Sequence, residues 1–308
     1  MTALKRIVVG TRGSTLALYQ TEEILKQLSY HHPDTEFVVS IIHSRGDRER
    51  EAPLLSLGKG IFVSDIETAL LEGEIDLAVH SLKDLLSTLP PGLTLGAIGQ
   101  RLDPRDVLVN RWGVTLDKLP LGAKIGTSSP RREALIRSER PDIQVVPIRG
   151  NVDTRLEKAK SRDYDGVVLA AAGIMRLDRQ EEISEYLPPQ KFIPAVGQGA
   201  LAVEIRSDDE QTLEIVSKAE HPPTRIAVNA ERAFLQALGG GCKVPLAAYG
   251  EVKENKLFLY GMAATVDGPR LFRAEIVSDT SYPVEVGQRL AQELMDSGAR
   301  EIIETEEA

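Results

Sequence analysis

A single cysteine, Cys242, is the first candidate for chemistry in this chain of 308 residues. It directly follows three glycines in the run GGGCKVP at 239–245. Because glycine has no side chain, little bulk surrounds the approach to the cysteine sulfur. A lone cysteine cannot form an internal disulfide or a cysteine-rich metal site, whereas its thiolate can act as a nucleophile. The alternative is a small buried hydrophobe in a helix-to-strand turn, and the other motifs decide between the two.

A second candidate is Asp84, in the run HSLKD at 80–84, which directly follows the apolar run at 75–79. The carboxyl end of a parallel strand is where α/β sheets place their ligands. At that point Asp84 is a candidate general base or a stabiliser of a cation. A helix cap or a turn is the alternative for a single aspartate in this position.

Three polar loops join strand patterns to helix patterns: GTRGS at 10–14, GTSSPRR at 126–132 and RGNVDTR at 149–155. Backbone N–H groups, hydroxyls and guanidinium groups at helix starts bind anions, and Pro130 suits the first helical position. Residues 124–155 include seven basic and four acidic residues, a local charge of +3 in a chain of net charge -9. Ordinary capping explains any one loop, but the three together favour an anionic small molecule.

The overall charge and the apolar pattern exclude several classes of protein. With 37 basic and 46 acidic residues the chain is acidic, so we expect no nucleic-acid partner. No apolar run approaches the ~18 residues of a membrane span, and the first residues show no signal peptide. We therefore expect a cytoplasmic protein with no membrane partner, and no motif has metal-ligand spacing. The run GQGALA at 197–202 loosely fits a dinucleotide fingerprint, but a β-like run follows it instead of a helix.

Short apolar runs alternate with helical patterns through the first two-thirds of the chain. We expect strands at 6–9, 37–42, 75–79, 93–97, 107–109, 124–126, 144–148 and 166–169. We expect helices at 15–28, 64–71, 131–138 and 152–160. This alternation predicts an α/β architecture with mostly parallel sheets covered by helices.

The last third of the chain has a different pattern. A helix is expected at 227–238, ended by glycines, and strands are expected at 244–252, 256–266 and 270–277. The Asp267–Gly268 pair predicts a hairpin between the last two strands. A helix at 284–295 closes this unit, and 301–308 is expected to be a short acidic tail. The pattern predicts an α+β domain with a small antiparallel sheet.

Two segments, 100–106 and 194–200, resemble crossings between two α/β lobes, although periodicity alone does not establish a double crossing. If both are hinges, the lobes form a cleft of the kind that closes on a ligand. The expected domains are a first lobe at 1–99 and 200–218 with the catalytic aspartate, a second lobe at 105–194 with the arginine-rich loops, and a C-terminal domain at 219–308 with the cysteine.

In this order and spacing, these motifs resemble the porphobilinogen deaminase family, also called hydroxymethylbilane synthases. The resemblance also rests on GKGIF at 58–62, DPRD at 103–106, PAVGQGAL at 194–201 and ER at 231–232. It covers 10–245, with weaker agreement afterwards. It implies two lobes like those of type II periplasmic binding proteins with a doubly crossed hinge, plus a C-terminal α+β domain with a small antiparallel sheet. It also implies a cytoplasmic monomer.

The same resemblance implies a reaction and a cofactor. The enzyme would be a transferase of tetrapyrrole biosynthesis that joins four porphobilinogen molecules head to tail, with release of ammonia, to give hydroxymethylbilane. A dipyrromethane cofactor, attached to Cys242 through a thioether, would prime the reaction. Loss of ammonia from porphobilinogen leaves a cationic electrophile, and a carboxylate at Asp84 would offset its charge.

The resemblance assigns a role to each candidate residue. Asp84 is the catalytic residue and Cys242 is the cofactor-attachment residue. The cofactor-binding residues are Ser81, Lys83, Asp84, Thr127, Ser128, Ser129, Arg131, Arg132, Arg149, Gly150, Gly173 and Gln198. The substrate-binding residues are Arg12, Ser14, Gln20, Lys59, Arg149, Asn151, Arg155 and Arg176.

The sequence departs from the family pattern at Leu86, where the family usually has Pro, and at Pro130, where Leu is common. Leu86 lacks the backbone restriction of proline and so loosens the loop beside Asp84.

One alternative to the deaminase is a non-catalytic two-lobed binder of an organic anion, which explains the polar loops but not the position of Cys242. A second alternative, cysteine acyl transfer, lacks a histidine near Cys242 in the sequence.

Overall fold

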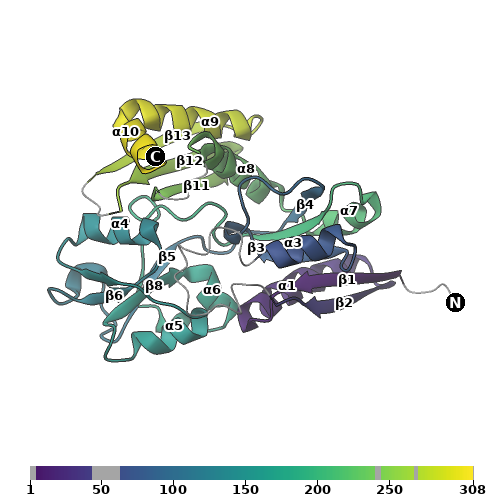
Figure 1. Ribbon diagram of the computed structural model, residues 1–308, viewed down its shortest axis with the longest axis horizontal. Coiled ribbons are helices and arrows are strands. Elements are labelled where there is room, and N and C mark those ends of the chain that lie inside the picture. The colour runs from purple at the N-terminus through teal and green to yellow at the C-terminus, as the bar shows by residue number, and fades with distance from the viewer. Residues whose placement is uncertain (1–4, 44–62, 240–243, 267–269, 308) are drawn as a thin grey trace. The chain divides into compact units, whose positions relative to one another are not determined.

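The computed structural model describes residues 5–43, 63–239, 244–266 and 270–307 (Figure 1). The chain divides into two compact units, Met1–Leu102 with Ala200–Arg225 and Asp103–Gly199 with Ile226–Ala308. It therefore leaves the first unit after Leu102 and returns to it after Gly199, which confirms the predicted double crossing. Within the described ranges, no helix is both long and apolar enough to span a membrane.

The first unit is built on a five-stranded sheet. In spatial order its strands are β2 (Thr35–Ile41), β1 (Lys5–Thr11), β3 (Leu77–Ser81), β10 (Leu201–Arg206) and β4 (Leu93–Ile98). β1 runs parallel to β2 and β3, whereas β10 runs antiparallel to both β3 and β4. The returning segment therefore supplies a strand that lies between two strands from the beginning of the chain.

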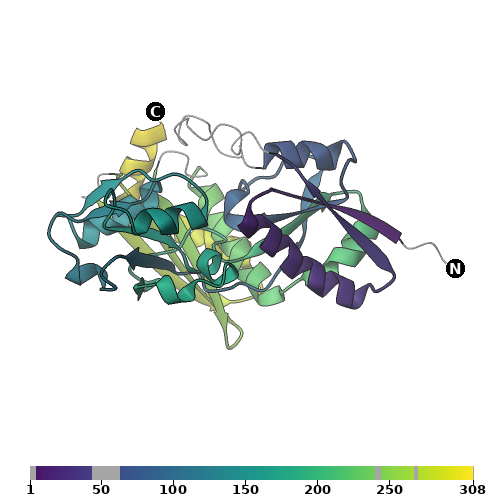
Figure 2. The ribbon, with the colours of Figure 1, turned by 90° about the horizontal axis from the view of Figure 1, so that it is seen from below.

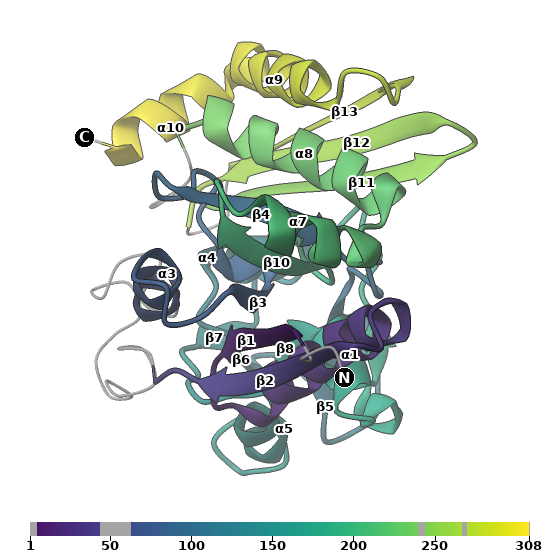
Figure 3. The ribbon, with the colours of Figure 1, turned by 90° about the vertical axis from the view of Figure 1, so that its right-hand side faces the viewer.

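Helices cover both faces of this sheet. They are α1 (Thr15–His31) and α7 (Glu210–Val216) on one face, and α3 (Ser64–Leu71) on the other. Figures 2 and 3 show α1 and α3 on opposite sides of β1. Ile7 and Val9 of β1 pack with Leu28 of α1, whereas Val8 packs with Leu70 of α3. This alternation follows from the period of two residues along a strand.

The second unit contains another five-stranded sheet with the same arrangement. In spatial order its strands are β7 (Gln144–Val146), β6 (Lys124–Gly126), β8 (Gly166–Ala170), β5 (Asp106–Asn110) and β9 (Glu185–Tyr186). Its helices are α4 (Pro130–Glu139), α5 (Val152–Ala159) and α6 (Ala171–Arg176). β6 runs parallel to β7 and β8, and β5 runs antiparallel to β8 and β9.

The mostly parallel sheets expected from the sequence are confirmed, with one exception in each. In both sheets the antiparallel strand is the first strand after a crossing, β5 after Leu102 and β10 after Gly199. An apolar run has the same composition whichever way its strand points, so periodicity could not predict this reversal. The reversal places the beginning of β5 and the end of β8 at the same edge, since Asp106 pairs with Ala170.

The second unit also contains the three-stranded antiparallel sheet that was predicted for the last third of the chain. Its elements are α8 (Pro222–Ala237), β11 (Leu246–Lys253), β12 (Lys256–Ala264), β13 (Leu271–Asp279), α9 (Pro283–Leu294) and α10 (Arg300–Glu307). Phe234 of α8 and Leu290 of α9 are fully buried in one hydrophobic cluster. A Cβ on Gly287 would lie 2.2 Å from the carbonyl oxygen of Ala230, so only glycine lets α9 come this close to α8.

Three details of the last third differ from the expectation. The acidic tail predicted at 301–308 is wrong, because Arg300–Glu307 forms a helix whose Ile302 and Ile303 are buried against the core. The helix expected from 227 begins at Pro222 instead, since proline is tolerated in a first turn. The β12–β13 pairing is antiparallel as predicted, while the predicted Asp267–Gly268 hairpin turn lies outside the described residues.

Candidate functional site

The loop after β1 brings predicted site residues to the start of α1. Ser14 is the N-cap of α1, where its Oγ accepts a hydrogen bond from the Ala17 N–H at 3.2 Å. One turn further on, the buried Gln20 donates from Nε2 to Ser81 Oγ at 2.7 Å. Gln20 and Ser81 were assigned to substrate and cofactor from separate motifs, and the fold places them in direct contact. Arg12 lies in the same loop and is partly exposed.

Asp84 lies in a 3₁₀ turn, η2 (Leu82–Asp84), that directly follows β3. Leu82 and Leu85 are buried on either side of the exposed Lys83–Asp84 pair. The Leu82 N–H donates to the carbonyl of Ala200 at 3.1 Å, which fixes the turn to the strand of the returning segment. The fold therefore holds the backbone firmly and presents both charged side chains at the end of the strand, where the sequence predicted them.

The second polar loop joins β6 to α4. Ser129 is the N-cap of α4 and accepts a hydrogen bond from the Arg132 N–H at 3.4 Å, and Pro130 opens the helix as predicted. Ser128 Oγ donates to the carbonyl of Ile148 at 2.8 Å and accepts from the N–H of the same residue at 3.0 Å. Thr127 Oγ1 accepts from the Ser129 N–H at 3.2 Å. These hydroxyls shape the loop, so capping accounts for part of this motif.

The two arginines at the start of α4 bind a buried carboxylate. Arg131 Nη1 donates to Asp106 Oδ2 at 2.7 Å and to the carbonyl of Ile193 at 2.8 Å. Arg132 donates to Asp106 Oδ1 from Nε at 3.1 Å and from Nη2 at 2.8 Å, and its Nη1 donates to the carbonyl of Val168 at 3.0 Å. Asp106 is completely buried, and Arg131 and Arg132 are only 6% and 7% exposed. We call these three residues the arginine cluster.

The arginine cluster keeps its charges despite burial. Burial by itself raises the pKa of Asp106, but the charges and hydrogen bonds of the two arginines outweigh it and hold that pKa far below its ordinary value. Burial lowers the pKa of Arg132 below its ordinary value, and the charge of Asp106 opposes this effect. Two guanidinium groups and one carboxylate leave one net positive charge. Sequence reasoning assigned no role to Asp106, although the DPRD motif contains it.

Gln198, in the returning segment, completes the surroundings of Asp106. Its Nε2 donates to Asp106 Oδ1 at 2.9 Å and to the carbonyl of Pro104 at 2.7 Å. Both acceptors fix the orientation of the amide. Its Oε1 is buried and has no hydrogen-bond partner among the described residues. The amide thus links the outgoing segment to the returning one and leaves one buried acceptor for a donor.

The third polar loop opens α5. Asn151 is the N-cap, and its Oδ1 accepts from the Thr154 N–H at 3.0 Å. Gly150 has a φ of 114° and Arg155 Nε donates to its carbonyl at 2.8 Å. A Cβ on Gly150 would lie 2.6 Å from Thr154 Cγ2, so this loop requires glycine. Arg149 stands before it, partly exposed.

The remaining predicted residues fall at three other places. Gly173 is buried within α6, and Arg176 ends that helix with its Nη2 donating to the carbonyl of Gly199 at 3.4 Å. Lys59 and Cys242 lie outside the described residues. Of the predicted residues that the structure describes, those of the first unit lie at the ends of β1 and β3 and on α1. Those of the second unit lie at the starts of α4 and α5, on α6 and, for Gln198, in the returning segment.

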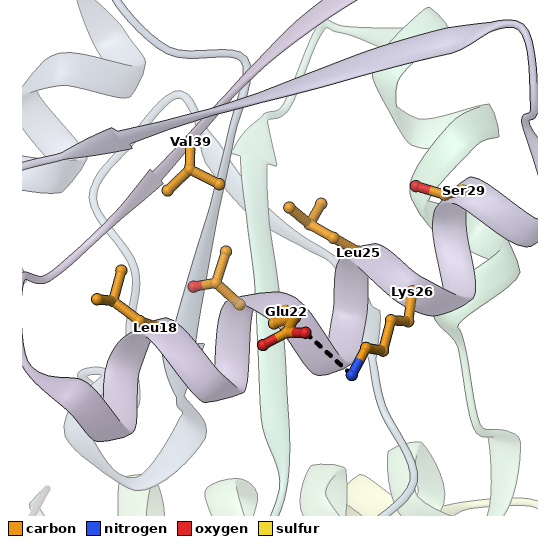
Figure 4. A pocket seen from close by; sticks show the side chains of 7 residues that line it. Leu18, Glu22, Leu25, Lys26, Ser29 and Val39 are labelled. Carbon is orange, nitrogen blue, oxygen red and sulfur yellow. Dashed lines mark ion pairs between the residues drawn. The ribbon is translucent and has the colours of Figure 1, made fainter.

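A pocket of about 450 Å³ lies elsewhere, between α1 and β2 of the first unit (Figure 4). It is lined by Leu18, Thr21, Glu22, Leu25, Lys26, Ser29 and Val39. Its only drawn polar contact is an ion pair between Glu22 and Lys26 at 3.0 Å. None of the predicted site residues lines this pocket, so the candidate site is not there.

Comparison with known families decides between the interpretations. A family model described as porphobilinogen deaminase, dipyromethane cofactor binding domain, matches residues 7–214. A second, the porphobilinogen deaminase C-terminal domain, matches residues 225–296. The chain belongs to the porphobilinogen deaminase family. The porphobilinogen deaminase of Syntrophotalea carbinolica is 48% identical over 296 residues, 96% of this chain and 94% of that protein. That of Roseiflexus castenholzii is 47% identical over 298 residues, 96% and 98% of the two chains.

Membership in the porphobilinogen deaminase family confirms the predicted activity and cofactor. The chain is a transferase of tetrapyrrole biosynthesis that converts porphobilinogen to hydroxymethylbilane on a dipyrromethane cofactor, and it is not a mere anion binder. Among solved structures, a methionine-binding protein matches with a TM-score of 0.45 and 11% identity over 70% of this chain and 89% of that chain. That similarity is too low to carry an argument, so the confirmed fold class rests on the sheet topology and the family.

The residues of the second unit fit a dipyrromethane. Such a cofactor carries carboxylates, which need cationic donors, and pyrrole N–H groups, which need acceptors. The arginine cluster offers a net positive charge, and Gln198 Oε1 is a buried acceptor without a partner in the described part of the chain. An apolar lining would not suit this ligand, whereas this donor and acceptor set does.

Proposed function

We propose that Asp84 is the catalytic carboxylate of the deaminase reaction and that Cys242 carries the cofactor through a thioether. The observation that supports this most strongly is the position of Asp84. It lies in an exposed turn at the end of β3, and Leu82 and Leu85 anchor that turn in the core. Among the described residues, no hydrogen bond or ion pair holds the Asp84 carboxylate. It is therefore available to a ligand.

The charge of Asp84 has a specific task in this chemistry. Porphobilinogen becomes cationic as ammonia leaves, and a nearby carboxylate stabilises that charge. A unit charge pair at about 4 Å contributes about 4 kcal/mol at an effective dielectric near 20, equivalent to roughly a thousandfold in rate. The anchored turn holds the backbone of Asp84 at the end of β3, so the residue is in place before the reaction.

The cofactor-binding residues predicted from the resemblance would hold the dipyrromethane. When bound, dipyrromethane supplies a free pyrrole α-carbon as the nucleophile. We assign its carboxylates to the arginine cluster and to the hydroxyls of the loop before α4, with further contacts from the other predicted residues. These residues are Ser81, Lys83, Thr127, Ser128, Ser129, Arg131, Arg132, Arg149, Gly150, Gly173 and Gln198.

A separate set would bind the incoming porphobilinogen and the growing chain. Each porphobilinogen brings an acetate and a propionate, so the ligand becomes more anionic with every addition. Arginines and helix N-termini suit such a ligand. The residues assigned to this task are Arg12, Ser14, Gln20, Lys59, Arg149, Asn151, Arg155 and Arg176.

We further propose a cytoplasmic monomer of three domains that binds neither nucleic acid nor membrane. The net charge of -9 supports the absence of a polyanionic partner. The domain limits remain those expected from the sequence, with a first lobe at 1–99 and 200–218, a second lobe at 105–194 and a C-terminal domain at 219–308.

Replacing Asp84 tests the proposed role. In Asp84→Asn we expect hydroxymethylbilane formation to fall roughly a thousandfold, because the neutral amide no longer offsets the cationic charge. Ammonia release and product absorbance measure the rate, and intact mass establishes how much of each sample carries the cofactor. Asp208→Asn, at an exposed position of the same unit, is the control and should turn over at the wild-type rate. A cofactor-loaded Asp84→Asn within tenfold of wild type would remove Asp84 from the mechanism.

A further inference from the structure

We propose that Asp106 is a positioning residue for cofactor binding. Its buried carboxylate orients Arg131 and Arg132 and sets the net charge that they present to the carboxylates of the dipyrromethane. The inference rests on the proposed function, because it assumes that these arginines bind the cofactor. It goes beyond that function in giving Asp106, which touches neither substrate nor cofactor in this scheme, control over the loading of the enzyme.

The two arginines differ in how many of their side-chain nitrogens donate hydrogen bonds to the protein. Arg132 uses all three of its nitrogens on protein acceptors, two of them on a single oxygen of Asp106. Arg131 uses only Nη1, which donates to Asp106 and to the carbonyl of Ile193. Its Nε and Nη2 have no partner among the described residues. Asp106 therefore locks Arg132 in place and leaves one free side of the Arg131 guanidinium for an anion.

The charges of the arginine cluster explain why it would choose a carboxylate. Without Asp106, two guanidinium groups would lie buried beside each other and repel. With Asp106 the cluster keeps one net positive charge, because the carboxylate stays ionised far below neutral pH. One carboxylate from a ligand then completes the neutralisation. A cluster with equal numbers of positive and negative charges would be neutral and would not attract a ligand carboxylate in this way.

Asp106 also connects the cluster to three parts of the second unit. It is the first residue of β5, and both arginines belong to the first turn of α4. Gln198 reaches the same carboxylate from the returning segment. Arg132 adds a bond to the carbonyl of Val168 in β8. The carboxylate is thus the shared point that fixes the start of α4 relative to β5, β8 and the returning segment.

Cofactor loading of Asp106→Asn tests the inference. The asparagine keeps the size of the side chain but lacks the charge, so the two guanidinium groups repel each other and lose the carboxylate that orients them. We expect the folded variant to acquire the dipyrromethane mass at least tenfold more slowly than wild type during incubation with porphobilinogen. The measurement is intact mass under denaturing conditions, expressed as the loaded share of the monodisperse population with native circular dichroism. A merely structural role would reduce the folded population without changing that share.

Asp142→Asn is the matched control, because Asp142 also pairs with an arginine, Arg140 at 2.7 Å, but near the surface of the same unit. The Asp142→Asn variant should load with cofactor as fast as wild type.

Wild-type loading by folded Asp106→Asn would overturn the inference. If Asp106→Asn yields no folded protein, Asp106→Glu keeps the charge and displaces the carboxylate by one methylene. We expect it to load at least threefold more slowly, and loading at the wild-type rate would again overturn the inference. A wild-type protein that never gains the mass would instead refute the proposed function.

Discussion

Each unit contains a cluster of buried charged residues, and the two clusters have opposite character. In the second unit, the arginine cluster satisfies one carboxylate with two guanidinium groups. In the first unit, Glu67 of α3, His80 of β3 and Glu204 of β10 form what we call the acid cluster. His80 Nε2 lies 3.0 Å from Glu204 Oε2, but neither atom has hydrogen-bond geometry to a partner in the described chain.

The acid cluster has more carboxylate than cation to balance it. Burial, and then the charge of Glu204, raise the pKa of Glu67, while His80 acts in the opposite direction. Glu67 Oε1 and both carboxylate oxygens of Glu204 are buried without a hydrogen-bond partner among the described residues. Two related sheets therefore treat buried charge differently. The second unit fixes its charges with hydrogen bonds, and the first keeps carboxylates whose charge is poorly compensated.

The largest expected difference between the two clusters is in how much a buried carboxylate of each contributes to the free energy of unfolding. Asp106→Asn should lower the free energy of unfolding by about 3–5 kcal/mol, because it leaves two buried cations without a partner. Glu204→Gln should change it by less than about 1 kcal/mol, because losing the 3.0 Å contact with His80 is offset by removing the repulsion between the Glu204 and Glu67 carboxylates. Urea unfolding followed by circular dichroism compares the two variants with wild type. An equal loss in both would contradict the distinction.

A smaller effect compares the helix starts of the two units. Ser14 caps α1 and Ser129 caps α4 through matching side-chain hydrogen bonds. Ser14→Ala and Ser129→Ala should each lower the free energy of unfolding by about 1 kcal/mol. Ser→Asp at either position retains a capping oxygen and should recover most of the loss in thermal unfolding. A loss below about 0.3 kcal/mol at one position would mean that its serine does not act as a cap.

The smallest expected effect is a dependence on pH confined to the first unit. The pKa of Glu67 is raised from 4.5, so the folded protein holds this proton more tightly than the unfolded chain. Stability from this group is present below pH 4.5 and is lost as the pH rises through the higher folded pKa. Glu67→Gln should therefore gain stability relative to wild type as the pH rises through that range. Chemical unfolding at several pH values tests this. Glu72→Gln, exposed at the end of the same helix, should follow wild type, and a Glu67→Gln difference that stays constant with pH would contradict the account.

The sequence predicted the local elements around the candidate site. As expected, Asp84 lies directly after a strand and Pro130 opens a helix. Ser14, Ser129 and Asn151 were assigned to ligands, and each of them caps a helix, the role that the sequence analysis kept as the alternative. Contacts between distant segments were not predictable. Asp106 and Arg131 are 25 residues apart, and nothing in their spacing indicates that they meet. The direction of β5 was missed because the composition of a strand is the same in either direction. The helix α10 was missed because Ile302 and Ile303 are surrounded by acidic residues, which indicated an exposed tail.

The most direct test of the central claim is the intact mass of the purified protein under denaturing conditions. We predict that the wild-type chain carries the extra mass of one dipyrromethane and that Cys242→Ser does not. Both proteins should show the same circular dichroism, because the substitution removes only the attachment sulfur. A wild-type chain with the bare polypeptide mass, and with no gain after incubation with porphobilinogen, would contradict the account.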